Sequence, residues 1–437
     1  MERGGANTSG RAEGRRRLDR LRRIAIDLSP LRASRDFRAL WFGLLVSGIG
    51  YQFTTVATFF QVYDMTRSAV AVGLIGLVGF AAILVGTLLG GTFVDVVDRR
   101  TTLIWTQVAS GAGSLLLLGG VVASTDSVGV VYVGISLIAG SSAIDASVRN
   151  AMTPRLVGND LLPAAIALNQ VVHNTTTLIG PALAGIVIAR TSLGWAYGID
   201  VGTYACMLLV ALSIRPVPPE TVDEHDAGWA AVRRGFAYLR GRHVLQAAFG
   251  IDIVAMVFGM PRALFPILAI TRFHEGLEVV GLLFAAPAVG AVLGALTGGW
   301  VGRIRHQGQA VCWAVAAWGA SIAAFGVVGS NLGLAVLFLA LAGASDVISA
   351  IFRGAIIQLS VPDAMRGRLS GINFLVVAGG PRLGDLEAGI VASLTTPAAS
   401  VVAGGLACIA GAGLIAWLVP SFRRYRPPSA AANPAAS

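Results

Sequence analysis

Apolar segments alternate with short polar breaks along most of the chain. Each segment is about 20 residues long, the length that an α-helix needs to cross the hydrocarbon core of a bilayer. The pattern predicts twelve membrane-spanning helices, and because twelve is even, both ends of the chain are expected on one side of the membrane. The predicted spans cover residues 39–62, 70–93, 102–123, 129–147, 163–188, 194–213, 244–270, 279–301, 310–328, 332–352, 370–393 and 397–419.

The composition agrees with this pattern. Apolar residues make up 55% of the 437 residues, charged residues make up 13%, and the mean hydropathy is +0.73. The charged share is about half that of an ordinary soluble protein. We therefore predict an all-α, multi-pass membrane protein and exclude a soluble globular domain.

The arginines indicate the orientation in the membrane. All 33 basic residues are arginine, and eleven of them lie in the N-terminal tail between Arg3 and Arg38. The other connections on that side hold seventeen, whereas the opposite connections hold only Arg67, Arg190 and Arg272. By the positive-inside rule, both termini are cytoplasmic and the protein lies in the plasma (inner) membrane. The net charge of +10 then follows from topology and contact with anionic membrane lipids, and no folded basic module predicts nucleic-acid binding.

The two ends of the chain are polar. Residues 1–36 form an arginine-rich tail without the short apolar stretch and cleavage site of a signal peptide. We interpret it as a disordered or surface-lying cytoplasmic segment, with a regulatory module as the alternative, and we interpret residues 421–437 as a disordered cytoplasmic tail. The three cysteines fall in separate spans without metal or redox spacing, which predicts buried apolar roles and no metal site. They are Cys206, Cys312 and Cys408.

The sequence also contains an internal repeat. Residues 71–95 match residues 279–303 at an offset of 208, and residues 149–187 match residues 353–391 at an offset of 204. The repeat unit is six spans, so the two copies share one orientation, which is a known plan for transporters with a site between the halves. The predicted domains are an N-terminal six-helix bundle at 37–214, a cytoplasmic linker with an amphipathic helix at 215–243, and a C-terminal six-helix bundle at 244–420.

One charged stretch, residues 376–394, lies inside a predicted span. The repeat aligns it with an ordinary apolar span at 172–190, so we predict that it is a membrane helix. Arg382 and Asp385 lie about 60° apart on one helical face and could pair, whereas Glu387 points elsewhere. Each charge is costly at the centre of a bilayer, so all three are candidates for contact with protein, water or substrate rather than lipid.

The connection between the second and third spans carries a motif. The sequence GGTFVDVVDRR, residues 90–100, resembles the cytoplasmic G-x-x-x-D-R-x-G-R-K signature of the major facilitator superfamily. It departs from that signature at Val96, where the family usually has Arg, and at Asp98, where it usually has Gly. The D-R-R ending is usual in the enterobactin-exporter-like branch, and Asp98 is well placed to cap the third span. The residues that fit the signature are Gly91, Asp95, Arg99 and Arg100.

Three further segments extend the resemblance to about residues 36–420. Gly180, Pro181 and Gly185 look like the Gly-Pro motif of proton-antiporting exporters, and residues 257–266 and 361–372 look like the enterobactin-exporter-like branch. The resemblance implies the major facilitator fold, with twelve helices in two parallel six-helix repeats, and transport by alternating access. The arginine that drug–proton antiporters carry in the fourth span has no counterpart here, so proton coupling would need another residue.

Asp95 ends a predicted helix, where its charge meets the negative end of the helix dipole and requires a nearby cation. We predict that Asp95, Arg99 and Arg100 form a cytoplasmic latch between helices, a role that the resemblance also implies. The alternative is that they only hold the loop in water and set the topology. Arg149 and Arg353, repeated at the cytoplasmic ends of the fourth and tenth spans, are assigned to the same gate.

Acidic residues inside spans are functional candidates by default. Asp145 lies four residues before Arg149, which favours a structural pair, and Asp200 is left open between helix packing and substrate contact. Asp252 and Arg262 share one predicted span but are ten residues apart, too far to pair directly. The predicted C-terminal wall of the cavity consists of Asp252, Asp346, Arg382 and Asp385, with a buried structural network as the alternative.

The N-terminal wall is predicted from the fifth and first spans. Asn169 and His173 lie one turn apart, and His173 could carry a proton, although a histidine hydrogen-bonded between helices is the alternative. Tyr51 and Gln52 of the first span could add polar cavity contacts.

No nucleotide-binding, hydrolase or metal motif occurs in the sequence, so an enzyme and an ATP-driven pump are excluded and no cofactor is expected. We predict a monomeric secondary transporter, driven by an ion gradient, that exchanges protons for an amphipathic small molecule such as a siderophore or drug. Import by the same fold and a non-transporting sensor or scaffold are the alternatives.

Overall fold

The computed structural model describes residues 27–125, 127–218, 235, 237–297 and 304–426, and these residues form helices without strands. Within them, the side chains at 91–96, 363, 364, 366–368, 370, 371, 374 and 375 lie outside the description. The helices are α2 (Ser29–Ala33), α3 (Arg35–Thr66), α4 (Ala69–Val96), α5 (Arg99–Val122), α6 (Val128–Val157), α7 (Leu162–Arg190), α8 (Leu193–Ser213), α10 (His243–Phe258), η1 (Arg262–Leu264), α11 (Phe265–Thr271), α12 (Leu277–Thr297), α13 (Gln307–Val327), α14 (Leu332–Ser360), α15 (Asp363–Leu394), α16 (Pro397–Leu418) and α17 (Pro420–Arg423).

Each predicted span corresponds to a helical segment, so the predicted all-α architecture is confirmed. Eleven described segments are long and apolar enough to cross a bilayer, with His243–Thr271 counted as one. The charged stretch lies in α15, which stands at the position of the eleventh predicted span.

The predicted span 244–270 is interrupted in the structure. Helix α10 ends at Phe258, and the chain resumes as η1 after Pro261. Proline lacks a backbone N–H and its ring clashes with the preceding turn, which explains the break. The Trp318 indole Nε1 donates to the Gly259 carbonyl at 3.1 Å and so satisfies a backbone group near the break. The interruption places Arg262 on η1, and discontinuous helices of this kind form the binding sites of many transporters.

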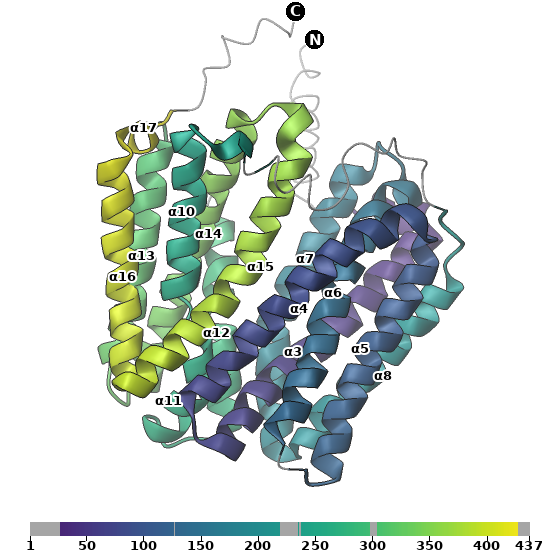
Figure 1. The fold of residues 1–437 in the computed structure, drawn as a ribbon, viewed down its shortest axis with the longest axis horizontal. Helices are drawn as coiled ribbons and strands as arrows, with labels where there is room; N and C mark the ends of the chain where they lie inside the picture. Colours follow the sequence, from purple (N-terminus) through teal and green to yellow (C-terminus); the bar gives the residue numbers. More distant parts are fainter. Residues whose placement is uncertain (1–26, 126, 219–234, 236, 298–303, 427–437) are drawn as a thin grey trace, which may run out of the picture.

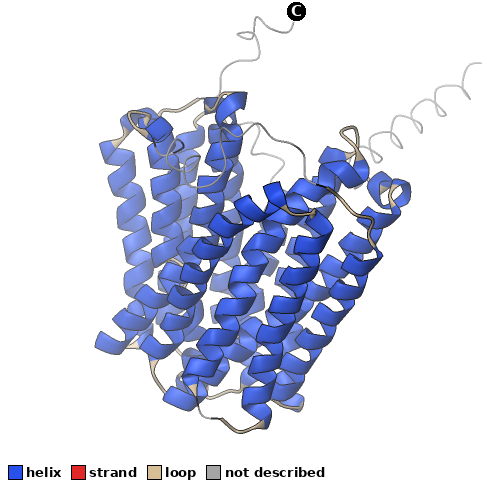
Figure 2. Cartoon of the chain, turned by 45° about the vertical axis from the view of Figure 1, so that its right-hand side comes forward, coloured by secondary structure: helices blue, strands red, loops and turns tan. Residues whose placement is uncertain are grey.

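The helices form two bundles, α3–α8 and α10–α16, which meet mainly through the pairs α4–α15 and α7–α12. Because the repeat relates α4 to α12 and α7 to α15, the two contacts are equivalent by pseudo-twofold symmetry. Figure 1 shows α4 and α15 crossing at the end of the molecule opposite the chain termini, and Figure 2 shows the same bundles after a 45° turn. We call the end opposite the termini the far side, and the end that carries the termini the terminus side.

Glycines make both crossings possible. At the α7–α12 crossing, a Cβ atom on Gly281 would lie 2.6 Å from the Pro181 carbonyl oxygen and 2.8 Å from the Gly185 Cα. At the α4–α15 crossing, a Cβ atom on Gly73 would lie 2.7 Å from the Asp385 carbonyl oxygen. In the repeat, Gly73 corresponds to Gly281 and Asp385 corresponds to Pro181. The repeated glycines therefore let the two halves approach backbone to backbone on the far side.

Short ordered segments lie at both ends of the described chain. Helix α2 and the first turn of α3 fall within the predicted tail 1–36, and Asp36 forms an ion pair of 2.9 Å with Arg215. Phe422, in the predicted tail 421–437, is fully buried. Residues 1–26 and 427–437, and most of the predicted linker with its amphipathic helix, lie outside the described residues.

Candidate transport site

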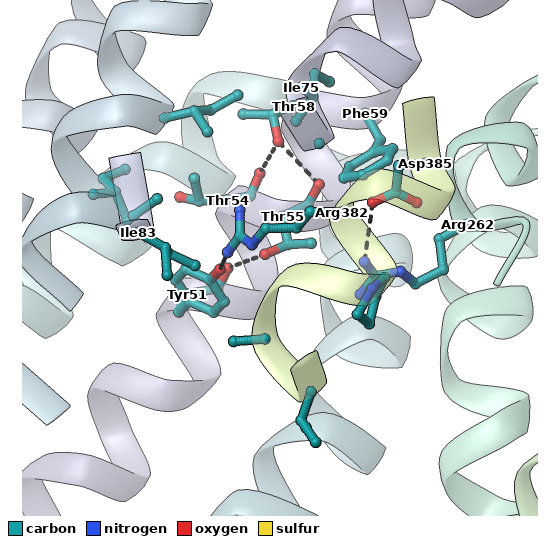
Figure 3. A pocket seen from close by; sticks show the side chains of 17 residues that line it. Tyr51, Thr54, Thr55, Thr58, Phe59, Ile75, Ile83, Arg262, Arg382 and Asp385 are labelled. Carbon is teal, nitrogen blue, oxygen red and sulfur yellow. Dashed lines mark hydrogen bonds and ion pairs between the residues drawn. The ribbon is translucent and has the colours of Figure 1, made fainter. Parts of the chain in front are cut away.

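A cavity of about 230 Å³ lies between the two halves. Its walls come from α3, α4 and α6 on one side and from η1 and α15 on the other, as Figure 3 shows. Apolar side chains such as Phe59 and Ile83 line it together with hydroxyl groups and three charged groups: Arg262, Arg382 and Asp385. The cavity is therefore amphipathic, and it lies where a substrate would contact both halves.

The charged groups pair differently from the prediction. Asp385, only 1% exposed, accepts a hydrogen bond of 2.9 Å from Arg262 Nη2, whereas Arg382 Nη2 donates to the Tyr51 hydroxyl at 3.1 Å. The hydrogen bond to Asp385 thus comes from Arg262 instead of Arg382, because the break before η1 brings Arg262 to Asp385. Arg382 lies within electrostatic reach of Asp385 as well, so one carboxylate serves two guanidinium groups and one positive charge is left facing the cavity.

Small residues on α4 make room for Arg382. Gly73, Gly76 and Gly79 follow one another at a spacing of three on the face of α4 that meets α15. A methyl group on Gly79 would overlap the Arg382 guanidinium, and one on Gly76 would lie 2.8 Å from the Asp385 Cβ. The repeat replaces Gly76 by Phe284, so this glycine row is specific to the helix that packs against the charged span.

The hydroxyl groups come from one face of α3. Three threonines follow Tyr51 at three, four and seven residues, and all four side chains line the cavity. The threonines are Thr54, Thr55 and Thr58. Tyr51 is predicted from the sequence to contact the cavity, whereas the threonines are not, although their helical spacing in YQFTTVAT is a usable signal. Gln52 is not part of the wall, because it packs against Gly180 of α7, where a Cβ would lie 2.6 Å from the Gln52 Cβ.

Helix α7 carries a polar face toward the other half. His173 is exposed, and Gln170 donates to Asn174 at 2.9 Å. Gln170 and Asn174 continue the helical face that Pro181 and Gly185 present to α12, whereas His173 lies on an adjacent face. Asn169 is half-buried on a neighbouring face.

The whole chain resembles known transporters. The sequence matches the family described as transmembrane secretion effector over residues 25–433. The enterobactin exporter EntS of Citrobacter koseri is 28% identical over 406 residues, which cover 92% of this chain and 96% of the relative. EntS of Escherichia coli O81 is 27% identical over 413 residues, which cover 93% of this chain and 98% of the relative.

The chain is a transmembrane secretion effector of the major facilitator superfamily. It is thus a secondary transporter and a multi-pass membrane protein, not an enzyme, as the sequence predicts. Two solved structures share the fold of this secretion effector. A POT family transporter in complex with 5-aminolevulinic acid has a TM-score of 0.71 and 12% identity, and the match covers 89% of this chain and 97% of that chain. A bacterial homologue of the iron transporter ferroportin in an inward-facing state has a TM-score of 0.67 and 15% identity, and the match covers 90% of this chain and 99% of that chain.

The structure separates two predicted cavity residues of this secretion effector from the cavity. Asp252 forms an ion pair of 2.6 Å with Arg353, which also donates to Ser349 at 2.7 Å. Asp346 is half-buried and lies within electrostatic reach of both Asp252 and Arg353. Arg353 had been assigned to the gate, but its charge is buried inside the C-terminal bundle, where Asp252 neutralises it.

Glu387 also lies apart from the cavity. It is half-buried on the side of α15 that approaches Cys408 of α16, and it does not line the cavity around Arg382. Its position two residues after Asp385 turns it away from that cavity, as the helical geometry predicts.

The predicted latch residues contact helices of the N-terminal half. Arg99 Nη1 donates to the Ala151 carbonyl of α6 at 3.1 Å, and Arg100 Nη2 donates to the Leu212 carbonyl of α8 at 2.6 Å. Asp98 caps α5 by accepting from the Thr101 N–H at 3.0 Å, as predicted. The side chains of Gly91 and Asp95 lie outside the described residues. Arg149 forms the predicted i,i+4 pair with Asp145.

Replacing Arg353 by methionine is expected to lower the free energy of unfolding by about 3–5 kcal/mol, because Asp252 then remains buried without its cation. The double variant Arg353→Met/Asp252→Leu is expected to regain most of this loss. Thermal unfolding in detergent measures the effect, with Arg67→Gln in an exposed ion pair as the control. Equal destabilisation in the single and double variants would contradict the pairing.

Proposed function

We propose that this transporter exports an anionic, amphipathic small molecule of the siderophore class from the cytoplasm and exchanges it for protons. The observation that carries the proposal is the excess positive charge of Arg262 and Arg382 over Asp385 in a cavity between the halves. The relatives named as enterobactin exporters support the substrate class.

The cavity chemistry favours such a substrate. Arg382 presents a planar guanidinium whose only described hydrogen bond goes to the neutral Tyr51 hydroxyl, so a phenolate or carboxylate can replace that contact with a charge-assisted bond. The threonine hydroxyls of α3 supply further polar contacts, and Phe59 and Ile83 supply apolar ones. A volume of about 230 Å³ holds one arm of a large substrate, and the polar face of α7 accommodates the remainder.

The proposal includes a direction and an energy source. We place both termini in the cytoplasm, so that the far-side glycine crossings close the external end and the structure represents an inward-facing state. An ion gradient drives the cycle without a cofactor, the protein acts as a monomer, and anionic lipids contact its arginine-rich cytoplasmic side.

Transport into inverted membrane vesicles tests the proposal. Vesicles with the wild-type protein are expected to accumulate metal-free enterobactin when their lumen is acidified, and to accumulate its O-methylated, uncharged analogue about tenfold less, because a charge-assisted hydrogen bond is lost. Vesicles without the protein are the control. Equal transport of both compounds, or accumulation only with an alkaline lumen, would exclude proton-driven export of an anion.

A further inference from the structure

Asp200 lies in the centre of the N-terminal bundle, outside the charged cavity. It is fully buried on α8 and accepts hydrogen bonds from Thr54 Oγ1 of α3 at 2.5 Å and from Ser114 of α5. Thr203 Oγ1, on its own helix, lies 3.5 Å from the second carboxylate oxygen. Three helices thus bring hydroxyl groups to one carboxylate.

The site is built closely around this carboxylate. A methyl group on Gly50 of α3 would overlap the Thr203 hydroxyl and would lie 2.7 Å from Asp200 Oδ1. Glycine at this position therefore lets α3 approach α8 directly at the acid.

The other acids that the structure buries in the bundles have a cation. Asp145 pairs with Arg149, Asp252 with Arg353, and Asp385 with Arg262. In the described residues, the partners of Asp200 are hydroxyl groups. A buried carboxylate without a cation is unfavourable in a low dielectric, and such a group gains stability by taking up a proton. Hydroxyl groups can donate to the ionised form and accept from the neutral form, so they tolerate both.

The titratable neighbours of Asp200 are tyrosines. Tyr197 and Tyr204 on α8 lie within electrostatic reach, and beyond Tyr204 lie Tyr51 of α3 and Arg149 of α6. The Tyr197 hydroxyl is committed to Gln61, to which it donates at 2.6 Å. Helix α5 adds the Ser114 hydroxyl, which does not titrate.

Thr54 connects Asp200 to the cavity. Its side chain lines the cavity wall and its hydroxyl donates to the acid, so a proton can pass between cavity water and Asp200 through one hydroxyl group.

From this arrangement we infer that Asp200 is the group that carries the transported proton, which rests on the proposed function. The empty transporter returns between its two states only when Asp200 is neutral, whereas the loaded transporter moves with the acid ionised. The charged cavity of Arg262, Arg382 and Asp385 then binds the substrate, and a separate acid in the N-terminal half couples it to the pH gradient.

Infrared difference spectroscopy and transport by the same purified protein test the inference. The wild type is expected to show the carbonyl band of a protonated carboxylic acid that disappears at high pH, and Asp200→Asn is expected to lack it. In liposomes, Asp200→Asn is expected to keep the downhill counterflow of enterobactin. Its accumulation of enterobactin driven by a pH gradient is expected to be about tenfold lower, because one coupling interaction is lost. Asp64→Asn, in an exposed ion pair, is the control.

The outcomes separate the two proposals. Persistence of the band or of gradient-driven accumulation in Asp200→Asn would overturn the role of Asp200, and so would accumulation that responds to sodium and not to pH. If Asp200→Asn does not fold, Ser114→Ala keeps the acid and is expected to shift the pH at which the band disappears, and an unchanged midpoint would overturn the inference. Absence of enterobactin counterflow in the wild type would refute the proposed substrate alone, because the infrared result needs no substrate.

Discussion

Replacing Arg382 by glutamine is expected to weaken substrate binding by about ten- to a hundredfold, because one charge-assisted hydrogen bond contributes about 1.5–3 kcal/mol. The remaining Arg262 is neutralised by Asp385, so the cavity loses its excess positive charge. Fluorescence titration of the purified variant with enterobactin measures the affinity, and flux into inverted vesicles measures transport. Arg424→Gln, an exposed arginine on the terminus side, is the matched control.

A second variant reaches the same group without changing a charge. Gly79→Ala places a methyl group where the Arg382 guanidinium lies, so it is expected to reduce affinity in the same direction. Normal affinity in Arg382→Gln and Gly79→Ala together would remove this guanidinium from substrate binding.

The Gly281→Ala variant is expected not to close the far side, and its transport rate is expected to fall by more than about tenfold. The α7–α12 crossing leaves no space for a side-chain atom, and a packed interface does not deform continuously. The added Cβ would lie 2.6 Å from the Pro181 carbonyl oxygen, and backbone atoms cannot move aside as a flexible side chain can. By the repeat, Gly73→Ala, whose added Cβ would lie 2.7 Å from the Asp385 carbonyl oxygen, is expected to have the same effect. Gly202→Ala, where nothing lies within 4 Å, is the control.

Labelling distinguishes a closing defect from misfolding. In a variant without the three native cysteines, Thr58→Cys in the cavity wall is expected to react faster with an impermeant maleimide from outside when Gly281→Ala is added, because the external end then stays open. Unchanged labelling with normal transport would show that the crossing tolerates a side chain.

The fold could be predicted from the sequence because its signals are local or repeated. Span length and the 204- and 208-residue offsets yield the helix number and the two parallel halves without any tertiary information. The repeat also identified 370–393 as a helix in spite of its charges, and α15 covers that segment. The break at Pro261 is not predicted, although Pro261 lies inside the predicted span, two residues after Gly259.

The site could be predicted only in part, because partners depend on helix rotation and on contacts between distant segments. Arg382 and Asp385 do line one cavity, but the cation for Asp385 comes 123 residues earlier on η1. Asp252 is predicted to line the same cavity because it is an acid inside a span, yet it faces Arg353 inside its own bundle. The glycine row of α4 and the hydroxyl face of α3 have helical spacing and can be recognised in the sequence. The groups that they face cannot be predicted from the sequence, because they lie on other helices.

Untargeted mass spectrometry of medium and cell extract tests the central claim most directly. It compares a strain lacking this gene with the same strain carrying the wild type or Arg382→Gln, grown with little iron. An anionic, amphipathic compound is expected to accumulate inside the deletion strain and to leave the cell only when the wild type is present. A compound that leaves equally well with Arg382→Gln, or the absence of any difference between the strains, would contradict export through the charged cavity.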